Sequence, residues 1–401
     1  MEHITVVDLT QGVSGPFATR LLAQMGARVI KVERPGQGDL IRSWDNYVNG
    51  MCSGHAWVNP GKESLAVDLS TPEGREVLLR LVARADVLVE NFVPGTLEKW
   101  GLAPDLLREH SPDLICCRIS GFGQTGPYRD HPALDLIMQG EAGLISTNGA
   151  PDAPAKISLS VADISGAMYS VIAVLQALLH RQRGGPGQVI DLALFDTIMT
   201  WSGYFPYMWW YGRRTPGRVG LHHHTMAPYG PYRAGDGKIV IVAGGAGNYE
   251  QWRRLCECLE CPEIVDDPRF IDNAGRIANR EELNRCIEEA LARRGRDEWL
   301  TRLLAAGIPA GALNEFDEAL THPRIAHRGL VTEVPSAVGP IKVMDYPPQM
   351  SSLRAVNDLG PPLLGEHTRA ILAELDLAGE TDELARRAIV QLGEPRDEQV
   401  S

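Results

Sequence analysis

Hydrophobic and polar positions in the first two hundred residues predict a repeated alternation of strands and helices. Short apolar runs of strand length alternate with longer stretches in which apolar residues recur at helical spacing. Parallel strands need a crossover between them, so this order predicts a mostly parallel sheet with right-handed connections. The pattern predicts a doubly wound α/β domain, with strands at 4–9, 27–32, 64–69, 87–91 and 114–119 and helices at 17–25 and 72–83.

The pattern changes near residue 200 and again near residue 325. Residues 201–211 hold seven aromatic side chains, which indicate either a covered helix with a linker or, as their density favours, a partner interface. After them, an Asp-Gly turn, a strand at 239–243 and three helices predict a smaller α+β domain. Beyond residue 325 we expect irregular, proline-rich chain and a last helix at 368–375. The expected organisation is a large Rossmann-like domain from residues 1–200 and 326–401, an aromatic linker at 201–224 and a small α+β domain at 225–325.

The composition limits the partners of the protein. A net charge of −12 argues against nucleic acid or an anionic membrane as the main partner. No basic, apolar leader opens the chain and no run approaches 18 apolar residues, so we expect a cytoplasmic protein. The seven cysteines fit a reducing compartment. Cys256, Cys258 and Cys261 fall on a predicted helix where their side chains diverge, so we expect no metal site.

One carboxylate, Asp163, interrupts the apolar and small residues of 161–169. The alternation at 157–161 predicts a strand that leads to Asp163, and the apolar spacing after it predicts a buried helix. Backbone N–H groups and the helix dipole at such a junction favour an ionised carboxylate. Such a residue is either a helix cap or a nucleophile. Considered alone, Asp163 favours the cap, because Asp is a preferred N-cap residue.

Common cofactor and hydrolase motifs do not account for the chemistry. The loop after the first strand, Gly12-Val13-Ser14-Gly15, lacks the G-x-G-x-x-G spacing of a dinucleotide site, and Pro16 follows it. An NAD-dependent oxidoreductase is therefore the weaker alternative. The sequence also contains no Walker loop, HExxH or G-x-S-x-G motif.

Several short motifs, taken together and in order, resemble those of the family III CoA-transferases. This superfamily includes formyl-CoA transferase and carnitine CoA-transferase. Because the motifs follow one another over nearly the whole chain, the resemblance is specific for the superfamily. They are Asp8-Leu9-Thr10, Gly15-Pro16-Phe17-Ala18, residues 26–39, 61–69, 85–95 and 119–128, Asp163 with its helix, residues 187–191, and Leu364-Gly365-Glu366-His367-Thr368.

The resemblance implies roles for individual residues. It makes Asp163 the nucleophile, which reverses the preference for a cap, and the cap interaction then keeps the carboxylate charged. Backbone N–H groups of Gly-rich loops would stabilise the oxyanion, first at Gly121 and Gly123 and second at 244–247. Glu63 departs from the family pattern, and Arg28 and Lys31 are expected to be ordinary solvated charges. The residues implied to bind CoA are Val13, Ser14, Arg34, Asn91, Phe92, Lys99, Gly121 and Gly123.

The implied reaction exchanges CoA between two carboxylic acids without a tightly bound cofactor. Asp163 would form a mixed anhydride with the donor acyl group and then an aspartyl-CoA thioester. The coenzyme A thioester is a substrate, and the expected partners are this acyl-CoA, a small carboxylic acid and a second copy of the chain. The family resemblance implies an interlocked homodimer.

The same superfamily also contains α-methylacyl-CoA racemases, which need a second base. Leu134 stands where that base, a His, would be, and leucine transfers no proton, so transferase is favoured. The motifs look most like enzymes that move CoA from succinyl-CoA to itaconate, citramalate, malate or mesaconate. The second carboxylate of such an acceptor needs a cation, for which Arg42 or His224 is a candidate.

Overall fold

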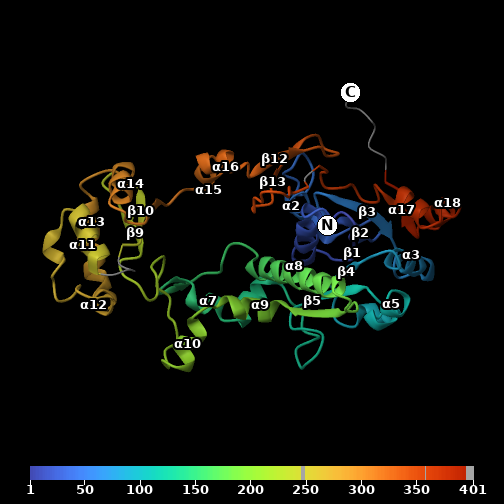
Figure 1. Cartoon of the computed structure of the whole chain (residues 1–401), viewed down its shortest axis with the longest axis horizontal. Helices are drawn as coiled ribbons and strands as arrows, with labels where there is room; N and C mark the ends of the chain where they lie inside the picture. Colours follow the sequence, from blue (N-terminus) through green and yellow to red (C-terminus); the bar gives the residue numbers. More distant parts are fainter. Residues whose placement is uncertain (245–248, 357, 394–401) are drawn as a thin grey trace. The chain divides into compact units, whose positions relative to one another are not determined.

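The computed structural model describes residues 1–244, 249–356 and 358–393, which form two compact units (Figure 1). Unit 1 contains Met1–Gly143, Ile157–Gly203 and the chain from Arg324 onward. Unit 2 contains Leu144–Lys156 and Tyr204–Pro323. Unit 2 therefore includes a short segment that interrupts the first two hundred residues.

Unit 1 is built on a seven-stranded, mostly parallel sheet, as the hydrophobic pattern predicts. The strand order is β14-β3-β2-β1-β4-β5-β8, and only β14 runs antiparallel, against β3. The order reverses between β1 and β4, where a doubly wound sheet opens a crevice at the carboxyl ends of its strands. The strands are β1 (Thr5–Asp8), β2 (Arg28–Glu33), β3 (Lys62–Val67), β4 (Val87–Glu90), β5 (Ile115–Ser120), β8 (Val189–Ala193) and β14 (Val390–Gln391).

Helices cover both faces of this sheet, which explains why its strands are apolar on both sides. Cys116 on β5 packs in the core beneath one set of helices, whereas the neighbouring Cys117 contacts Ser170 on the long helix α8 (Val161–Gln182). On the first face lie α3 (Pro72–Val82), α5 (Pro104–His110), α17 (Thr368–Glu374) and α18 (Thr381–Arg386). On the second lie α1 (Ser14–Gln24) and α8 (Val161–Gln182), which pack against each other, and α9 (Leu194–Trp201) packs on α8.

The local prediction around Asp163 is wrong in two respects. Residues 157–160 form no strand, and α8 already begins at Val161, so Asp163 lies inside the first helical turn. The helix is also not buried all round: Met168, Ile172, Leu175 and Leu179 are exposed along one side. By length and composition alone α8 could cross a membrane, but half of its apolar stretch is buried in unit 1, as in the core helix of a globular domain.

The chain beyond residue 325 is more regular than its proline content predicts. β12 (Val331–Val334) and β13 (Ile341–Met344) pair as an antiparallel hairpin, and β14 extends the main sheet. Side chains in β13 alternate between buried and exposed positions, as in a strand with one face on the core, and this pattern favours the hairpin despite the prolines around it. Other short elements of unit 1 are the 3-10 turn Leu40–Ser43, α2 (Ser53–Val58), α4 (Thr96–Lys99) and α6 (Asp135–Glu141). α16 (Pro323–Arg328) begins at the last residue of unit 2 and continues in unit 1.

Unit 2 is a small α+β body with its own core. Three antiparallel strands carry helices that bury Trp252 and Trp299 completely. The aromatic segment after α9 forms a short helix whose Tyr207, Trp209 and Trp210 are exposed, so it is not a covered helix. Its elements include α7 (Leu144–Thr147), β6 (Gly149–Ala150), β7 (Ala153–Pro154), α10 (Phe205–Trp210), β9 (Gly230–Arg233), β10 (Ile239–Val242), α11 (Tyr249–Cys258), α12 (Asn273–Ala278), α13 (Arg280–Leu291), α14 (Arg296–Ala305), β11 (Ala310–Ala312) and α15 (Phe316–Leu320).

Candidate active site

A cavity of about 370 Å³ lies at the point where the strand order reverses, and Asp163 is part of its wall. A second cavity of about 360 Å³ shares Gln11 and Phe92 with it. The two together give an elongated ligand the space that a doubly wound sheet offers at its switch point. The first is lined by, among others, Val13, Ser14, Leu40, Trp44, Asn91, Gly121, Leu134, Asp135 and Asp163, and the second by Arg34, Asp68, Thr96 and Trp100.

Asp163 is the third residue of α8 and is not its cap. Ser160 occupies the N-cap position and makes no side-chain cap hydrogen bond. Burial, and after it the charge of the nearby Asp135, raises the pKa of Asp163 to about 7. The prediction that a cap interaction keeps Asp163 charged is therefore wrong, because Asp163 does not occupy the cap position and burial disfavours its ionised form. Near neutral pH the protonated and the ionised forms of the Asp163 carboxyl group are therefore both populated.

The wall of the Asp163 cavity carries negative and neutral groups. Among the described residues that line it, Asp135 and Asp163 are the only charged ones. Leu134 lies immediately before α6 and is 72% exposed on the same wall. A leucine therefore lines the cavity at the position where a racemase would hold its second base. His131 instead packs edge-to-face against the ring of Tyr128.

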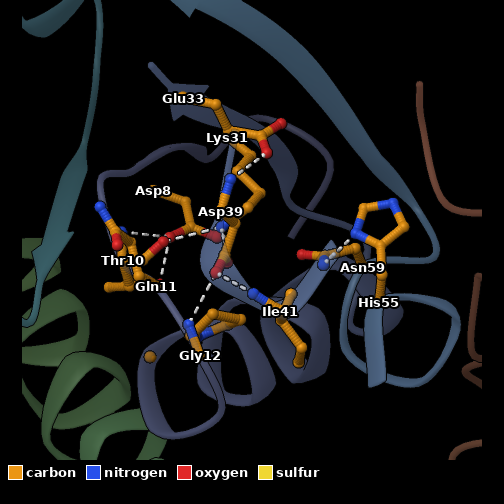
Figure 2. A network of polar contacts seen from close by, with 12 residues as sticks. Asp8, Thr10, Gln11, Gly12, Lys31, Glu33, Asp39, Ile41, His55 and Asn59 are labelled. Atoms are coloured by element: carbon orange, nitrogen blue, oxygen red, sulfur yellow. Dashed lines mark hydrogen bonds and ion pairs between the residues drawn. The ribbon is translucent and has the colours of Figure 1, made fainter. Parts of the chain in front are cut away.

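A network of buried charges lies against the loop that follows β1 (Figure 2). Lys31 Nζ lies 2.9 Å from Asp39 Oδ2, and both side chains are inaccessible to solvent. Lys62 Nζ lies 2.9 Å from Asp8 Oδ2, again without solvent exposure. The expectation that Lys31 is a solvated surface charge is therefore wrong. Lys31 belongs to a strand covered on both faces, so its side chain has no route to solvent.

This network holds the cavity wall in place (Figure 2). Asp39 Oδ1 accepts hydrogen bonds from the backbone N–H groups of Gly12, at 2.9 Å, and Ile41, at 3.0 Å. Lys31 Nζ donates to the backbone oxygen of Thr10 at 2.7 Å. The Lys31–Asp39 ion pair thus fixes the loop that carries Val13 on the cavity wall. Such charges are worth burying only because each is paired and hydrogen-bonded.

Arg42 takes part in the same buried region and does not line the Asp163 cavity. Its guanidinium forms two hydrogen bonds to Glu33, at 2.7 and 2.8 Å, and two to the oxygen of Pro362, at 3.2 and 3.3 Å. Burial would raise the pKa of Glu33, but the hydrogen bonds and charge of Arg42 hold it at about 2. The guanidinium expected to bind an acceptor carboxylate is already paired with a protein carboxylate.

Of the residues implied to bind CoA, Lys99 and Gly123 line neither cavity, and the others are distributed over the two. Asn91 Oδ1 accepts from the N–H of Gln11 at 2.9 Å, and its Nδ2 donates to the Gln11 oxygen at 2.8 Å, so Asn91 shapes the wall. Phe92 contacts the edge of Trp100, with ring centroids 5.4 Å apart. Arg34 is exposed at the rim of the second cavity. Lys99 is exposed at the end of α4.

The two proposed oxyanion donors differ in their position relative to the cavity. Gly121 lines the Asp163 cavity, whereas the N–H of Gly123 donates to Ser120 Oγ at 3.0 Å. Gly121 is therefore the better placed of the two. Of the second glycine-rich loop, residues 245–247 lie outside the described residues. His224 belongs to unit 2, where its ring packs 4.7 Å from that of Phe205 and its Nε2 lies 2.9 Å from the Gly217 oxygen.

Comparison with known proteins identifies the family. The family model described as CoA-transferase family III matches residues 1–368. The chain belongs to CoA-transferase family III. Its relatives include a succinate–glutarate CoA-transferase of Agrobacterium fabrum, 38% identical, with 95% of this chain and 97% of the relative covered. A succinyl-CoA:mesaconate CoA-transferase of Haloarcula hispanica is also 38% identical, over 95% of this chain and 98% of the relative.

A solved structure agrees with the sequence comparison. A crystal structure of a CAIB/BAIF family protein from Brucella suis matches with a TM-score of 0.82 and 37% identity. The match covers 93% of this chain and 98% of that one. The membership gives no support to the alternative of an NAD-dependent oxidoreductase.

Sequence reasoning missed Asp135, Gln139 and the buried ion pairs. Lys31 could have been found, because it belongs to a strand that the pattern places inside a parallel sheet, whereas Lys62 lies before the strand predicted at 64–69 and enters β3 only in the structure. A lysine at such a position needs a buried carboxylate partner. Asp135 carries no comparable local signal. Its importance comes from a contact with residue 162, far along the chain.

Proposed function

We propose that this family III CoA-transferase moves CoA from succinyl-CoA to a small dicarboxylic acid, with Asp163 as the nucleophile. The observation that carries the proposal is the Asp163 carboxylate in the wall of a cavity at the switch point of the sheet. The substrate class is supported by relatives named for succinyl-CoA with glutarate or mesaconate. The coenzyme enters as a thioester substrate, with no tightly bound cofactor.

The proposed reaction proceeds through two covalent intermediates on Asp163. A carboxylate oxygen of Asp163 attacks the thioester carbonyl carbon, the C–S bond breaks, and CoA leaves as a thiolate. The thiolate then attacks the Asp163 carbonyl of the mixed anhydride, which releases succinate and leaves an aspartyl-CoA thioester. The acceptor carboxylate reverses these steps. Each tetrahedral intermediate carries an oxyanion, and we assign its stabilisation to the backbone N–H of Gly121, a residue that lines this cavity.

The distal carboxylate of the acceptor needs a different partner from the one expected. Arg42 is paired with Glu33, and the described lining of the Asp163 cavity contains no Lys, Arg or His. Gln11 and Ser14 remain as neutral hydrogen-bond donors on that wall. We therefore assign the carboxylate to neutral donors rather than to Arg42.

The proposed assembly is an interlocked homodimer in the cytoplasm. The apolar side of α8 that is exposed in one chain, with Ile172 56% accessible, supports burial against a second copy. Exposed aromatic side chains on α10 support the same interpretation. Light scattering should give twice the chain mass, and a stable monomer would contradict the assembly.

Trapping the covalent intermediate tests the reaction. After incubation with succinyl-CoA, borohydride should reduce the aspartyl thioester and mark the peptide that contains Asp163, as read by mass spectrometry. Asp163→Asn should show neither the mark nor CoA transfer to glutarate or mesaconate. Asp196→Asn, on α9, is the matched control and should keep both. A mark on another residue, or transfer by Asp163→Asn, would overturn the proposal.

A further inference from the structure

Asp135 lies at the start of α6, and its carboxylate reaches the first turn of α8. Asp135 Oδ1 accepts a hydrogen bond of 2.8 Å from the backbone N–H of Ala162, the residue just before Asp163. The first N–H groups of a helix have no partner within the helix, and Ser160 provides no side-chain cap. Asp135 therefore supplies, from a different helix, the cap that α8 lacks in its own sequence.

Gln139, one turn further along α6, completes this arrangement. Its side chain is fully buried, and its Nε2 donates to Asp135 Oδ2 at 2.8 Å. Gln139 Oε1 accepts from the N–H of Ile157 at 2.9 Å, and Nε2 lies 3.2 Å from the oxygen of the same residue. The segment that enters α8 is thus held at both ends by α6. Loss of either side chain would leave buried polar groups unpaired.

The same carboxylate places a negative charge beside the nucleophile. Asp135 and Asp163 line one cavity, and among the described residues Asp135 is the only charged group that shifts the pKa of Asp163. The remaining ionisable side chains on α8 and on the elements packed against it do not contribute. They are Arg20 on α1, Glu141 on α6, Cys116, Cys117 and Arg118 on β5, Asp191 on β8, Asp196 on α9, and Tyr169, His180 and Arg181 on α8.

Two of these neighbours are occupied elsewhere. Arg118 is paired with Glu90 and Glu98, and Arg20 donates to the backbone oxygen of Met344. Neither cation is therefore available to offset the two carboxylates. Like charges that share a site destabilise the ionised pair.

We propose that Asp135 is a positioning residue for Asp163, which fixes the first turn of α8 and keeps a second negative charge beside the nucleophile. The inference rests on the proposed nucleophilic role of Asp163. Attack on the thioester turns the charged Asp163 side chain into a neutral anhydride, and the displaced charge leaves on the CoA thiolate. Repulsion from Asp135 is relieved in that step, so the acylated enzyme is favoured relative to the free carboxylate. Gln139 holds Asp135 in the orientation that this requires.

The test measures the titration of Asp163 directly, in ligand-free protein. The infrared carboxyl band of Asp163 is obtained from the difference between each protein and its Asp163→Asn counterpart, as a function of pH. In the wild type the midpoint should lie near pH 7, in keeping with the raised pKa of Asp163. In Asp135→Asn the midpoint should fall by about one pH unit. Asp135→Ser, which is also neutral, carries the same test if the Asn variant does not fold.

Gln139→Met separates charge from position. This variant keeps the charge of Asp135 but loses the hydrogen bonds to Ile157, so the midpoint should stay near that of the wild type while kcat falls about tenfold. An unchanged midpoint in Asp135→Asn, or an equal fall in Gln139→Met, would overturn the inference. Because the titration needs no turnover, it can be read even if the proposed transfer reaction is not observed. Where transfer is measured, the pH profile of kcat/KM should move with the midpoint.

Discussion

The Lys62 ammonium lies 2.9 Å from the Asp8 carboxylate, and neither side chain is accessible to solvent. Lys62 Nζ also donates to the oxygen of Pro16, at 2.8 Å, and to Asn59 Oδ1, at 3.0 Å. An ammonium has three donors, and these contacts use all of them. Lys62 therefore ties β3 to the end of β1 and the start of α1, and has no donor left for a CoA phosphate.

Removing this ammonium should destabilise unit 1. Lys62→Met leaves the Asp8 carboxylate buried without its partner, which costs about 3–5 kcal/mol of unfolding free energy. Denaturant unfolding measures the loss. Lys99→Met, at an exposed lysine, should change the value by no more than about 0.5 kcal/mol. Adding Asp8→Asn to Lys62→Met should restore part of the stability, and equal stabilities of Lys62→Met and wild type would contradict the role of the pair.

The stability of the protein should fall as pH rises from about 4 to 7 because of Asp163. The pKa of Asp163 in the folded protein is about 7, against 3.8 for the ordinary group. Within that window the folded chain retains a proton that the unfolded chain has released, so unfolding becomes easier with rising pH. Asp163→Asn removes this effect and should stabilise the protein at pH 8 by at most about 4 kcal/mol.

Thermal unfolding of the two proteins at pH 4 and pH 8 measures this difference. The gain in melting temperature from Asp163→Asn should be present at pH 8 and nearly absent at pH 4. Asp196→Asn, which removes an exposed carboxylate on α9, serves as the control. A gain that is the same at both pH values would mean that Asp163 titrates normally.

Asn91→Ala should weaken binding of the acyl-CoA more than it slows turnover. The carboxamide makes two hydrogen bonds to the backbone of Gln11, and their loss loosens a wall shared by both cavities. A loss of about 1.4 kcal/mol in binding raises KM about tenfold. Steady-state kinetics with varied succinyl-CoA measures the change. Asn91→Asp keeps the acceptor for the Gln11 N–H, so a KM as high as that of Asn91→Ala would argue against this explanation.

The wild-type protein should not racemise a 2-methylacyl-CoA. Leu134 lies on the cavity wall where a second base is required, and its side chain exchanges no proton. Incubation in D2O, followed by mass spectrometry, should show no deuterium at the α-carbon above the enzyme-free rate. Leu134→His changes an exposed side chain, so its free energy of unfolding should lie within about 0.5 kcal/mol of the wild-type value. Deuterium uptake by the wild type would restore the racemase alternative.

The order of strands and helices follows closely from local sequence. Strands expected at 27–32 and 87–91 appear at Arg28–Glu33 and Val87–Glu90, and the helix expected at 72–83 is Pro72–Val82. The spacing of apolar side chains is a local property of the sequence, so it predicts these elements without knowledge of their tertiary contacts. The strand expected before Asp163 fails because five alternating residues cannot by themselves choose between a strand and an extended loop.

The sequence by itself determined that this chain folds as a doubly wound α/β protein and, through its ordered motifs, that it belongs among the CoA-transferases. The tertiary structure decided what the charged groups do. Lys31 is buried because helices cover its sheet. Asp163 carries a raised pKa first because packing buries its carboxyl group, and second because α6 brings Asp135 against the start of α8. Desolvation and charge pairing depend on neighbours distant along the chain, and only the packed fold assembles them.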